Sequence, residues 1–158
     1  MISLRKVTNE NGAVLQNLFQ FFCHELAVYD NTVPMKDGRY VLEGFHRYYT
    51  DPSLHSFLIC AGESTVGFVV VSWSSKTRSH IVQHMFVLNG HRRQGIATAA
   101  MTAVFERFRG PYRVGQIANH QDSILFWKAL YAKRRIDYQD AIEGEGLDKE
   151  LVQRFVIE

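Results

Sequence analysis

Apolar residues recur along this chain with two different spacings, which separate the predicted helices from the predicted strands. Between Gly12 and Tyr29, large apolar side chains fall three or four positions apart, on one side of a helix. Asn11 stands directly before this segment and is expected to cap it. Elsewhere, short β-branched and aromatic runs between turn residues predict strands. These patterns predict helices over Gly12–Tyr29, Tyr40–Tyr49, Ala97–Phe108 and Gln121–Lys133, and strands over Ile2–Val7, Ser56–Ala61, Val66–Ser74, His80–Leu88, Tyr112–Ala118, Ile136–Ile142 and Leu151–Ile157.

The order of these elements predicts the fold class. One strand is followed by two helices, three strands, a helix, a strand, a helix and two final strands. Such an order indicates a mixed α/β (α+β) sheet with helices on both faces. Gly62–Thr65 is short and begins with glycine, so it predicts a hairpin between its two flanking strands. At 158 residues, the chain is expected to form a single domain over residues 1–158.

Composition and charge narrow the class of protein. The chain is 46% hydrophobic and carries a formal net charge of +2, which excludes a disordered chain and argues against a nucleic-acid partner. No apolar run approaches the roughly 20 residues that a membrane span needs, and the start has no secretion signal, so we expect no membrane partner. The two cysteines favour a reducing compartment, and we expect a cytoplasmic protein.

The most informative segment for chemistry runs from Met85 to Thr98, where a predicted strand enters a short loop and then a helix. The first backbone N–H groups of a helix have no partner within the helix and favour an anionic guest. Gly95 lets such a guest approach the backbone, and Arg92 and Arg93 add positive charge. The spacing Arg92-x-x-Gly95-x-Ala97 matches neither a nucleoside triphosphatase loop nor a dinucleotide fingerprint. The segment therefore predicts a phosphate-binding site of another kind.

This segment resembles the phosphate-binding loop of the general N-acetyltransferase (GNAT) superfamily. The resemblance extends over nearly the whole chain and is closest to a bacterial branch of uncharacterised acetyltransferases. Its further motifs are Leu18-Phe19-Gln20, Asp37-Gly38, Tyr49-x-Asp51-Pro52, Gly67-Phe68, Gly110-Pro111-Tyr112-Arg113-Val114-Gly115-Gln116, Asn119 and Phe126-Trp127. The resemblance implies a GNAT-like fold, with a mostly antiparallel sheet and one parallel pair of strands that splay apart. It also implies acetyl-CoA as cosubstrate and transfer of its acetyl group to a primary amine.

The resemblance also implies which residues hold the coenzyme. The strand before the loop would bind the pantetheine arm through its backbone, and the loop would hold the pyrophosphate, mainly through main-chain N–H groups. The helix from Gln121 would contact the rest of the coenzyme. The residues carried over are Phe86, Val87 and Leu88 on the strand, Arg92, Arg93, Gln94, Gly95, Ile96, Ala97 and Thr98 in the loop, and Asn119, Ser123, Phe126 and Trp127 around the last helix.

The catalytic positions depart from the family pattern. Many relatives carry a carboxylate on the strand where this chain has Gln83-His84, and we predict His84 as the general base because the usual pKa of histidine lies near neutrality. The alternative is that His84 only packs within the fold. Relatives often place an acidic Tyr where Phe126-Trp127 stand, so Tyr131, one turn further, or water would protonate the leaving thiolate. Either Asn119 or His120 would take the coenzyme-facing position.

Several alternatives stay open from the sequence. A metal site is not expected, since His80 and His84 would lie about 13 Å apart on a strand. The run from Lys133 to Arg135 suits a helix C-terminus better than nucleic acid. A non-catalytic acyl-CoA sensor is the alternative function. The acceptor could be a small amine or a peptide or protein amine, with aromatic rings and Glu25, Asp30, Asp37 and Glu43 near its entrance. The oligomeric state stays open, a homodimer included.

Overall fold

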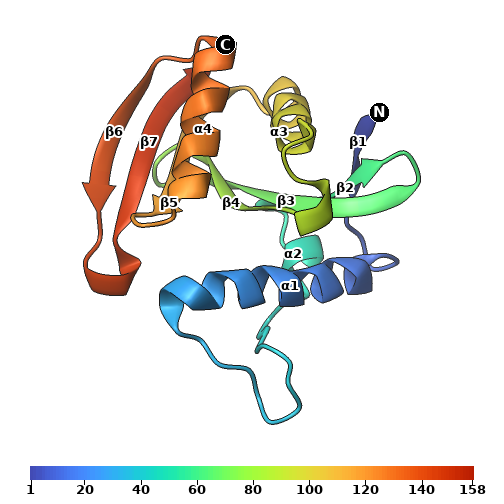
Figure 1. Ribbon diagram of the computed structural model, residues 1–158. Coiled ribbons are helices and arrows are strands. Elements are labelled where there is room, and N and C mark those ends of the chain that lie inside the picture. Colours follow the sequence, from blue (N-terminus) through green and yellow to red (C-terminus); the bar gives the residue numbers. More distant parts are fainter.

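A single mixed sheet forms the centre of the molecule (Figure 1), described here from a computed structural model that covers residues 1–158. Its seven strands follow the order β1-β2-β3-β4-β5-β7-β6. Every neighbouring pair is antiparallel except β4 and β5, which run parallel. The strands are β1 (Ile2–Lys6), β2 (Leu54–Ala61), β3 (Ser64–Ser74), β4 (Ser79–Val87), β5 (Gly110–Ile117), β6 (Tyr138–Glu143) and β7 (Glu150–Ile157).

Helices cover both faces of the sheet, and each face has its own apolar core. Helices α1 (Gly12–Asp30) and α2 (Arg47–Thr50) lie on one face, and α3 (Ile96–Arg107) and α4 (Gln121–Arg134) lie on the other (Figure 1). Leu15, Leu18 and Phe19 of α1 are buried with Phe68 and Phe86 in the smaller core. The larger core joins α3 and α4 to the alternate side chains of the same strands, as expected where successive side chains point to opposite faces.

These features confirm the predicted fold class and the sequence of elements. The hairpin predicted at Gly62–Thr65 joins β2 to β3, and β4 and β5 form the predicted parallel pair. Helix α3 begins directly after Gly95, so the predicted strand, loop and helix are all present.

The second helix is shorter than predicted. Instead of Tyr40–Tyr49, α2 covers only Arg47–Thr50. Gly44 has a positive φ of 63°, which an α-helix does not contain, so the helix begins only after it. Phe45 in this turn is buried in the smaller core, so tertiary packing holds the segment without helical hydrogen bonds.

The predicted side-chain cap at Asn11 is also wrong. The Asn11 side chain accepts a hydrogen bond from the Thr8 N–H and donates one to the Lys6 carbonyl, and it makes no bond to the first turn of α1. Asn11 thus fixes the turn between β1 and α1 by competing local hydrogen bonds.

Candidate active site

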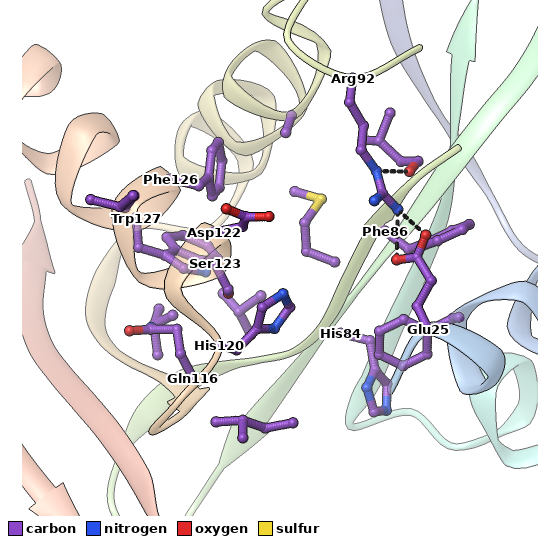
Figure 2. Close-up of a pocket in the computed structure, with 18 of the residues that line it drawn as sticks. Glu25, His84, Phe86, Arg92, Gln116, His120, Asp122, Ser123, Phe126 and Trp127 are labelled. Carbon is purple, nitrogen blue, oxygen red and sulfur yellow. Dashed lines mark hydrogen bonds and ion pairs between the residues drawn. The ribbon is translucent and has the colours of Figure 1, made fainter. Parts of the chain in front are cut away.

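A cleft opens where β4 and β5 separate. The two strands pair only at His80–Tyr112, Ile81–Arg113 and Val82–Val114. Beyond Val82, the edge of β4 that faces β5 has no strand partner, so its backbone polar groups are free to bind a ligand. A cavity of about 720 Å³ lies at this opening, lined by both strands, by the first turns of α3 and α4, and by α1 (Figure 2).

The start of α3 forms one end of the cavity. Gly95 has a φ of +78°, and no other atom would lie within 4 Å of a Cβ placed on it. Arg93 also has a positive φ, of 59°. The first helical hydrogen bond runs from the Ala99 N–H to the Gly95 carbonyl, and the N–H groups of Ile96, Ala97 and Thr98 donate to no backbone carbonyl. No side chain caps the helix. This turn is an exposed set of backbone donors, which suits an anion.

The Arg92 side chain does not project freely toward this turn. Its Nε donates to the Val87 carbonyl at 2.8 Å, and its terminal nitrogen contacts both oxygens of Glu25 at 2.6 and 2.7 Å (Figure 2). The guanidinium also lies 5.6 Å from the centre of the Phe86 ring. Arg92 therefore joins the end of β4 to α1 and fixes the position of the loop.

His84 lines the cavity from the α1 face of the sheet. Its ring packs against Phe19 and Phe22, with centroid distances of 5.2 and 5.3 Å. Its Nε2 forms a 3.0 Å hydrogen bond with the Tyr48 hydroxyl. Burial lowers the pKa of His84 to about 4, so the ring is neutral at pH 7. A neutral ring accepts hydrogen bonds well but holds a proton weakly.

Gln116 belongs to a buried hydrogen-bond network whose direction is fixed. Gln153 Nε2 donates to Asp140 Oδ1, so Gln153 presents its carbonyl oxygen to the interior. That oxygen accepts hydrogen bonds from Gln116 Nε2 at 2.7 Å and from the Tyr131 hydroxyl at 3.2 Å. Gln116 Oε1 is left buried with no hydrogen-bond partner, and Gln116 lines the cavity. Gln116 Oε1 is therefore the unsatisfied polar atom of this network, in a side chain that borders the cavity.

Helix α4 lines the opposite wall. His120, Asp122, Ser123, Phe126 and Trp127 all lie on the cavity side of this helix or directly before it (Figure 2). The His120 ring packs 4.6 Å from that of Tyr29, and burial lowers the His120 pKa.

The fully buried Tyr131 lies elsewhere, in the larger core. Burial, followed by the nearby Tyr138 and Asp140, raises its pKa. Tyr131 therefore lies behind the cavity wall, where its hydroxyl shares the Gln153 acceptor with Gln116, and it does not line the cavity itself.

The cavity brings together most of the residues selected from the sequence. Those that line it are His84, Phe86, Val87, Arg92, Arg93, Gly95, Ile96, Ala97, Thr98, Ser123, Phe126 and Trp127. Four do not line it: Leu88, Gln94, Asn119 and Tyr131. Between the two residues considered for the coenzyme-facing position, His120 lines the cavity and Asn119 does not.

Gln116 and Glu150 also line the cavity but were not selected from the sequence. Gln116 could have been selected from its position on β5. It lies two residues after Val114, the last residue paired with β4, and side chains two apart on a strand point to the same face. Glu150 carried no signal of its own, since it reaches the cavity only through the pairing of β7 with β5.

The carboxylates near the predicted acceptor entrance do not gather into one site. Glu25 pairs with Arg92, and Asp37 pairs with Arg39 at 2.7 Å. Asp30 accepts a hydrogen bond from the Thr32 N–H. Glu43 is exposed. Of the four, only Glu25 lines the cavity.

Two further properties of the whole chain are relevant to its function. No three His, Cys, Asp or Glu side chains come close enough together to hold a metal ion. None of the helices has the length and apolar character that crossing a membrane requires.

Comparisons with known proteins place the chain in a family. The model of the acetyltransferase (GNAT) family matches residues 16–130, most of the chain, so the protein belongs to the GNAT acetyltransferases. No curated protein sequence matches it significantly.

Solved structures show the same fold at low sequence identity. An acetyltransferase from Thermus thermophilus superposes with a TM-score of 0.73 at 13% identity, covering 98% of this chain and 96% of that one. Spermidine N-acetyltransferase from Vibrio cholerae, in complex with CoA and spermine, gives a TM-score of 0.70 at 12% identity, with 99% and 95% covered. Diaminobutyrate acetyltransferase from Paenibacillus lautus, in complex with its substrate and coenzyme A, gives 0.68 at 15% identity, with 99% and 95% covered.

Proposed function

We propose that the protein transfers the acetyl group of acetyl-CoA to the primary amine of an acceptor, most simply a small molecule, within a ternary complex. The observation that carries this proposal is that one cavity contains two sets of unpaired backbone groups, at the start of α3 and along the edge of β4. The unpaired amides at the start of α3 suit a pyrophosphate, and the free edge of β4 beyond Val82 suits the amides of a pantetheine arm.

The coenzyme is held mainly by backbone groups and apolar walls. Gly95 leaves open space over the amides of Ile96, Ala97 and Thr98, where the pyrophosphate binds. Phe86 and Val87 form the β4 wall, and Ser123, Phe126 and Trp127 form the α4 wall. A basic hollow next to Gly95, lined by Thr98, Thr102, Lys133 and Arg134, suits the remaining phosphate of the nucleotide.

Arg92 takes part by positioning rather than by direct phosphate contact. Its hydrogen bonds to Val87 and Glu25 hold the end of β4, the loop and α1 in one arrangement. The backbone N–H donors of this loop are thus already oriented before the coenzyme binds, which reduces the conformational entropy lost on binding.

The reaction forms an N–C bond between the amine and the acetyl carbonyl carbon and breaks the C–S bond of the thioester. The neutral amine transfers one proton overall to the departing thiolate. Bringing the amine and the thioester together at the β4–β5 opening supplies most of the acceleration, since the amine is itself a strong nucleophile. Neutral His84 accepts a hydrogen bond from the entering amine at Nδ1, in the tautomer whose Nε2–H donates to the Tyr48 hydroxyl. Solvent carries the proton onward, because a ring with a pKa of about 4 does not retain it.

The test is release of coenzyme A thiol from acetyl-CoA by the purified full chain with a panel of primary amines, together with calorimetric titration of CoA. We expect CoA to bind and at least one amine to be acetylated, with the product identified by mass spectrometry. Failure to bind CoA would contradict the proposal at its first step.

The second candidate function is a non-catalytic acyl-CoA sensor. It is favoured by Phe126, which stands where relatives often have an acidic Tyr, while Tyr131 lies in the core. The same experiment separates the two functions, because tight coenzyme binding without thiol release for any amine would favour the sensor.

A further inference from the structure

The carboxylate of Glu150 lies where a side chain at position 115 of the neighbouring strand would otherwise stand, because residue 115 is glycine. Glu150 begins β7 and pairs with Ile117, and its side chain reaches back over Gly115 of β5. A Cβ built on Gly115 would lie only 2.8 Å from Glu150 Oε1 and 3.1 Å from its Cδ. Real Cβ atoms essentially never come within 3.0 Å of another atom in this way. These atoms are the end of a flexible side chain, so a Cβ at position 115 would shift the Glu150 carboxylate, and glycine leaves room for it in this position.

Only one oxygen of this carboxylate has a hydrogen-bond partner. The Arg113 guanidinium donates to Glu150 Oε2 at 3.0 Å, and the same nitrogen donates to Glu143 Oε2 at 3.0 Å. Arg154 in turn donates to the other oxygen of Glu143, and the Arg154 and Arg113 hydrogen bonds lower the Glu143 pKa. The bond from Arg113 holds Glu150 Oε2, while Oε1 of this partly exposed side chain has no protein donor. The charges of Arg113 and Arg154 are balanced by those of Glu143 and Glu150. Arg113 therefore does not give this side of the cavity a net positive charge.

Glu150 lies on the opposite side of the sheet from the coenzyme loop. Val114 belongs to the larger core that contains α3 and α4, so the Gly115 position faces the other way, toward the α1 face. His84 lines the same cavity from that α1 face, against Phe19 and Phe22. His84 flanks the opening beyond the last β4–β5 pair (Figure 2), and Glu150 lines the same cavity. A molecule that approaches the opening from the α1 face therefore passes Glu150.

A fixed carboxylate oxygen with no donor suits a cationic N–H group. Glu25, another acidic residue that lines the cavity, has both oxygens engaged by Arg92. The third acidic residue of the lining, Asp122, lies in the first turn of α4 on the other face, so Glu150 is the acidic group on the α1 face that keeps an oxygen available for a ligand. An ammonium beside it gains a charge-assisted hydrogen bond, which is roughly twice as strong as a neutral one.

We propose that Glu150, placed over Gly115, binds a second ammonium group of the acceptor, so that the preferred substrates are diamines and not monoamines. The inference rests on the proposed acetyl transfer and names its substrate class. One amine binds at Glu150 Oε1 while the other reaches the thioester at the strand opening. Glu150 acts as a specificity-determining residue and takes no part in the proton transfer.

The test compares putrescine with n-butylamine, which has the same carbon chain but one amine. For the unmodified protein, kcat/KM for putrescine is expected to exceed that for n-butylamine by about 10-fold or more, as for one charged hydrogen bond. Glu150→Gln should remove this preference through a higher KM for putrescine while leaving CoA affinity unchanged. Gly115→Ala should act in the same direction, because its Cβ displaces the carboxylate.

Glu143→Gln is the matched control. It removes a charge from the same ion network, but Glu143 does not line the cavity. We expect it to keep the putrescine preference. Equal loss in Glu143→Gln and Glu150→Gln, or full retention in Glu150→Gln, would overturn the proposal.

A binding measurement separates this proposal from the proposed function. Putrescine is titrated calorimetrically into the CoA complex of the unmodified protein and of Glu150→Gln. Binding that weakens about 10-fold in the variant supports the Glu150 site even if no amine is acetylated. Absence of putrescine binding to the unmodified protein, or equal binding to both proteins, overturns it. Thermal unfolding of each variant verifies that it is folded.

Discussion

Arg92 and Glu25, which both line the cavity, connect the loop before α3 to α1. The two side chains meet at 2.6 Å, and each is 39% exposed. The same guanidinium holds the carbonyl of Val87 at the end of β4. Two segments that are 67 positions apart along the chain are thereby held in one arrangement around the opening.

Replacing Glu25 by Gln should change coenzyme affinity more than stability. An ion pair this exposed contributes about 1 kcal/mol or less to folding. Removing the carboxylate releases Arg92 from α1 and loosens the loop that this ion pair orients, so CoA should bind a few-fold more weakly at low salt, with a smaller difference at high salt, where the ion pair is screened. Calorimetric titration of CoA at two salt concentrations measures this effect. Glu10→Gln, which changes charge equally in the turn before α1, is the control. Unchanged or tighter CoA binding in Glu25→Gln would show that the ion pair does not orient the loop for binding.

Gly95→Glu should abolish CoA binding. The left-handed backbone at Gly95 costs a non-glycine residue roughly 1–2 kcal/mol, and the new carboxylate would stand among amides that suit an anion. Gly90→Ala in the same loop is the matched control, because Gly90 has an ordinary φ and open space around its Cβ position. CoA titration should show no binding to Gly95→Glu and normal binding to Gly90→Ala. Retained affinity in Gly95→Glu would remove the loop from the coenzyme site.

The strand, loop and helix around Gly95 were predictable because they depend on local structure. A strand, a loop with Gly95 and a helix are adjacent in the sequence, so their backbone geometry follows from residue types a few positions apart. Helix α1 was equally predictable from its regular apolar spacing. The length of α2 was not, because Phe45 is held by tertiary packing after the turn at Gly44.

The remaining walls of the site depend on strand pairing, which the sequence does not state. Glu150 reaches the cavity only because β7 inserts between β5 and β6. The exclusion of Tyr131 depends on its hydrogen bond to Gln153, which lies on β7, 22 positions later. The helical period places Tyr131 one turn after Trp127 but does not say which of the two faces a neighbouring strand.

Gly67→Ala should destabilise the protein and deform the cleft. A Cβ on Gly67 of β3 would lie 2.1 Å from the Phe86 carbonyl oxygen, a backbone atom of β4. Because backbone cannot rotate aside as a side chain does, we expect a loss of about 3 kcal/mol or more in unfolding free energy. Urea unfolding measures this loss, with Gly90→Ala as the unstrained control. A change below about 1 kcal/mol would contradict this close approach of β3 to β4.

His84 should make stability depend on pH between about 4 and 6.5. Its folded pKa of about 4 lies below the ordinary 6.5, so within this range the unfolded chain binds more protons. Stability from this residue is therefore complete above pH 6.5 and is lost as the pH falls toward 4, by about 3 kcal/mol in total. Urea unfolding at pH 7 and pH 4 should show that His84→Gln loses about 3 kcal/mol less than the unmodified protein. Identical losses in the two proteins would mean that the imidazole charges freely in the folded state.

Tyr131→Phe should lower stability without altering the acetyl-transfer rate. The variant loses one buried hydrogen bond to Gln153, which costs about 1 kcal/mol, while Gln153 keeps its bond from Gln116. Because burial raises the Tyr131 pKa and the hydroxyl lies outside the cavity lining, it is a poor proton donor to a leaving thiolate. Thermal unfolding and the pH profile of kcat measure the two effects, with Tyr138→Phe, whose ring lies 4.7 Å away, as the matched control. A fall in kcat of about 100-fold in Tyr131→Phe alone, with loss of the alkaline limb of its profile, would instead identify Tyr131 as the acid.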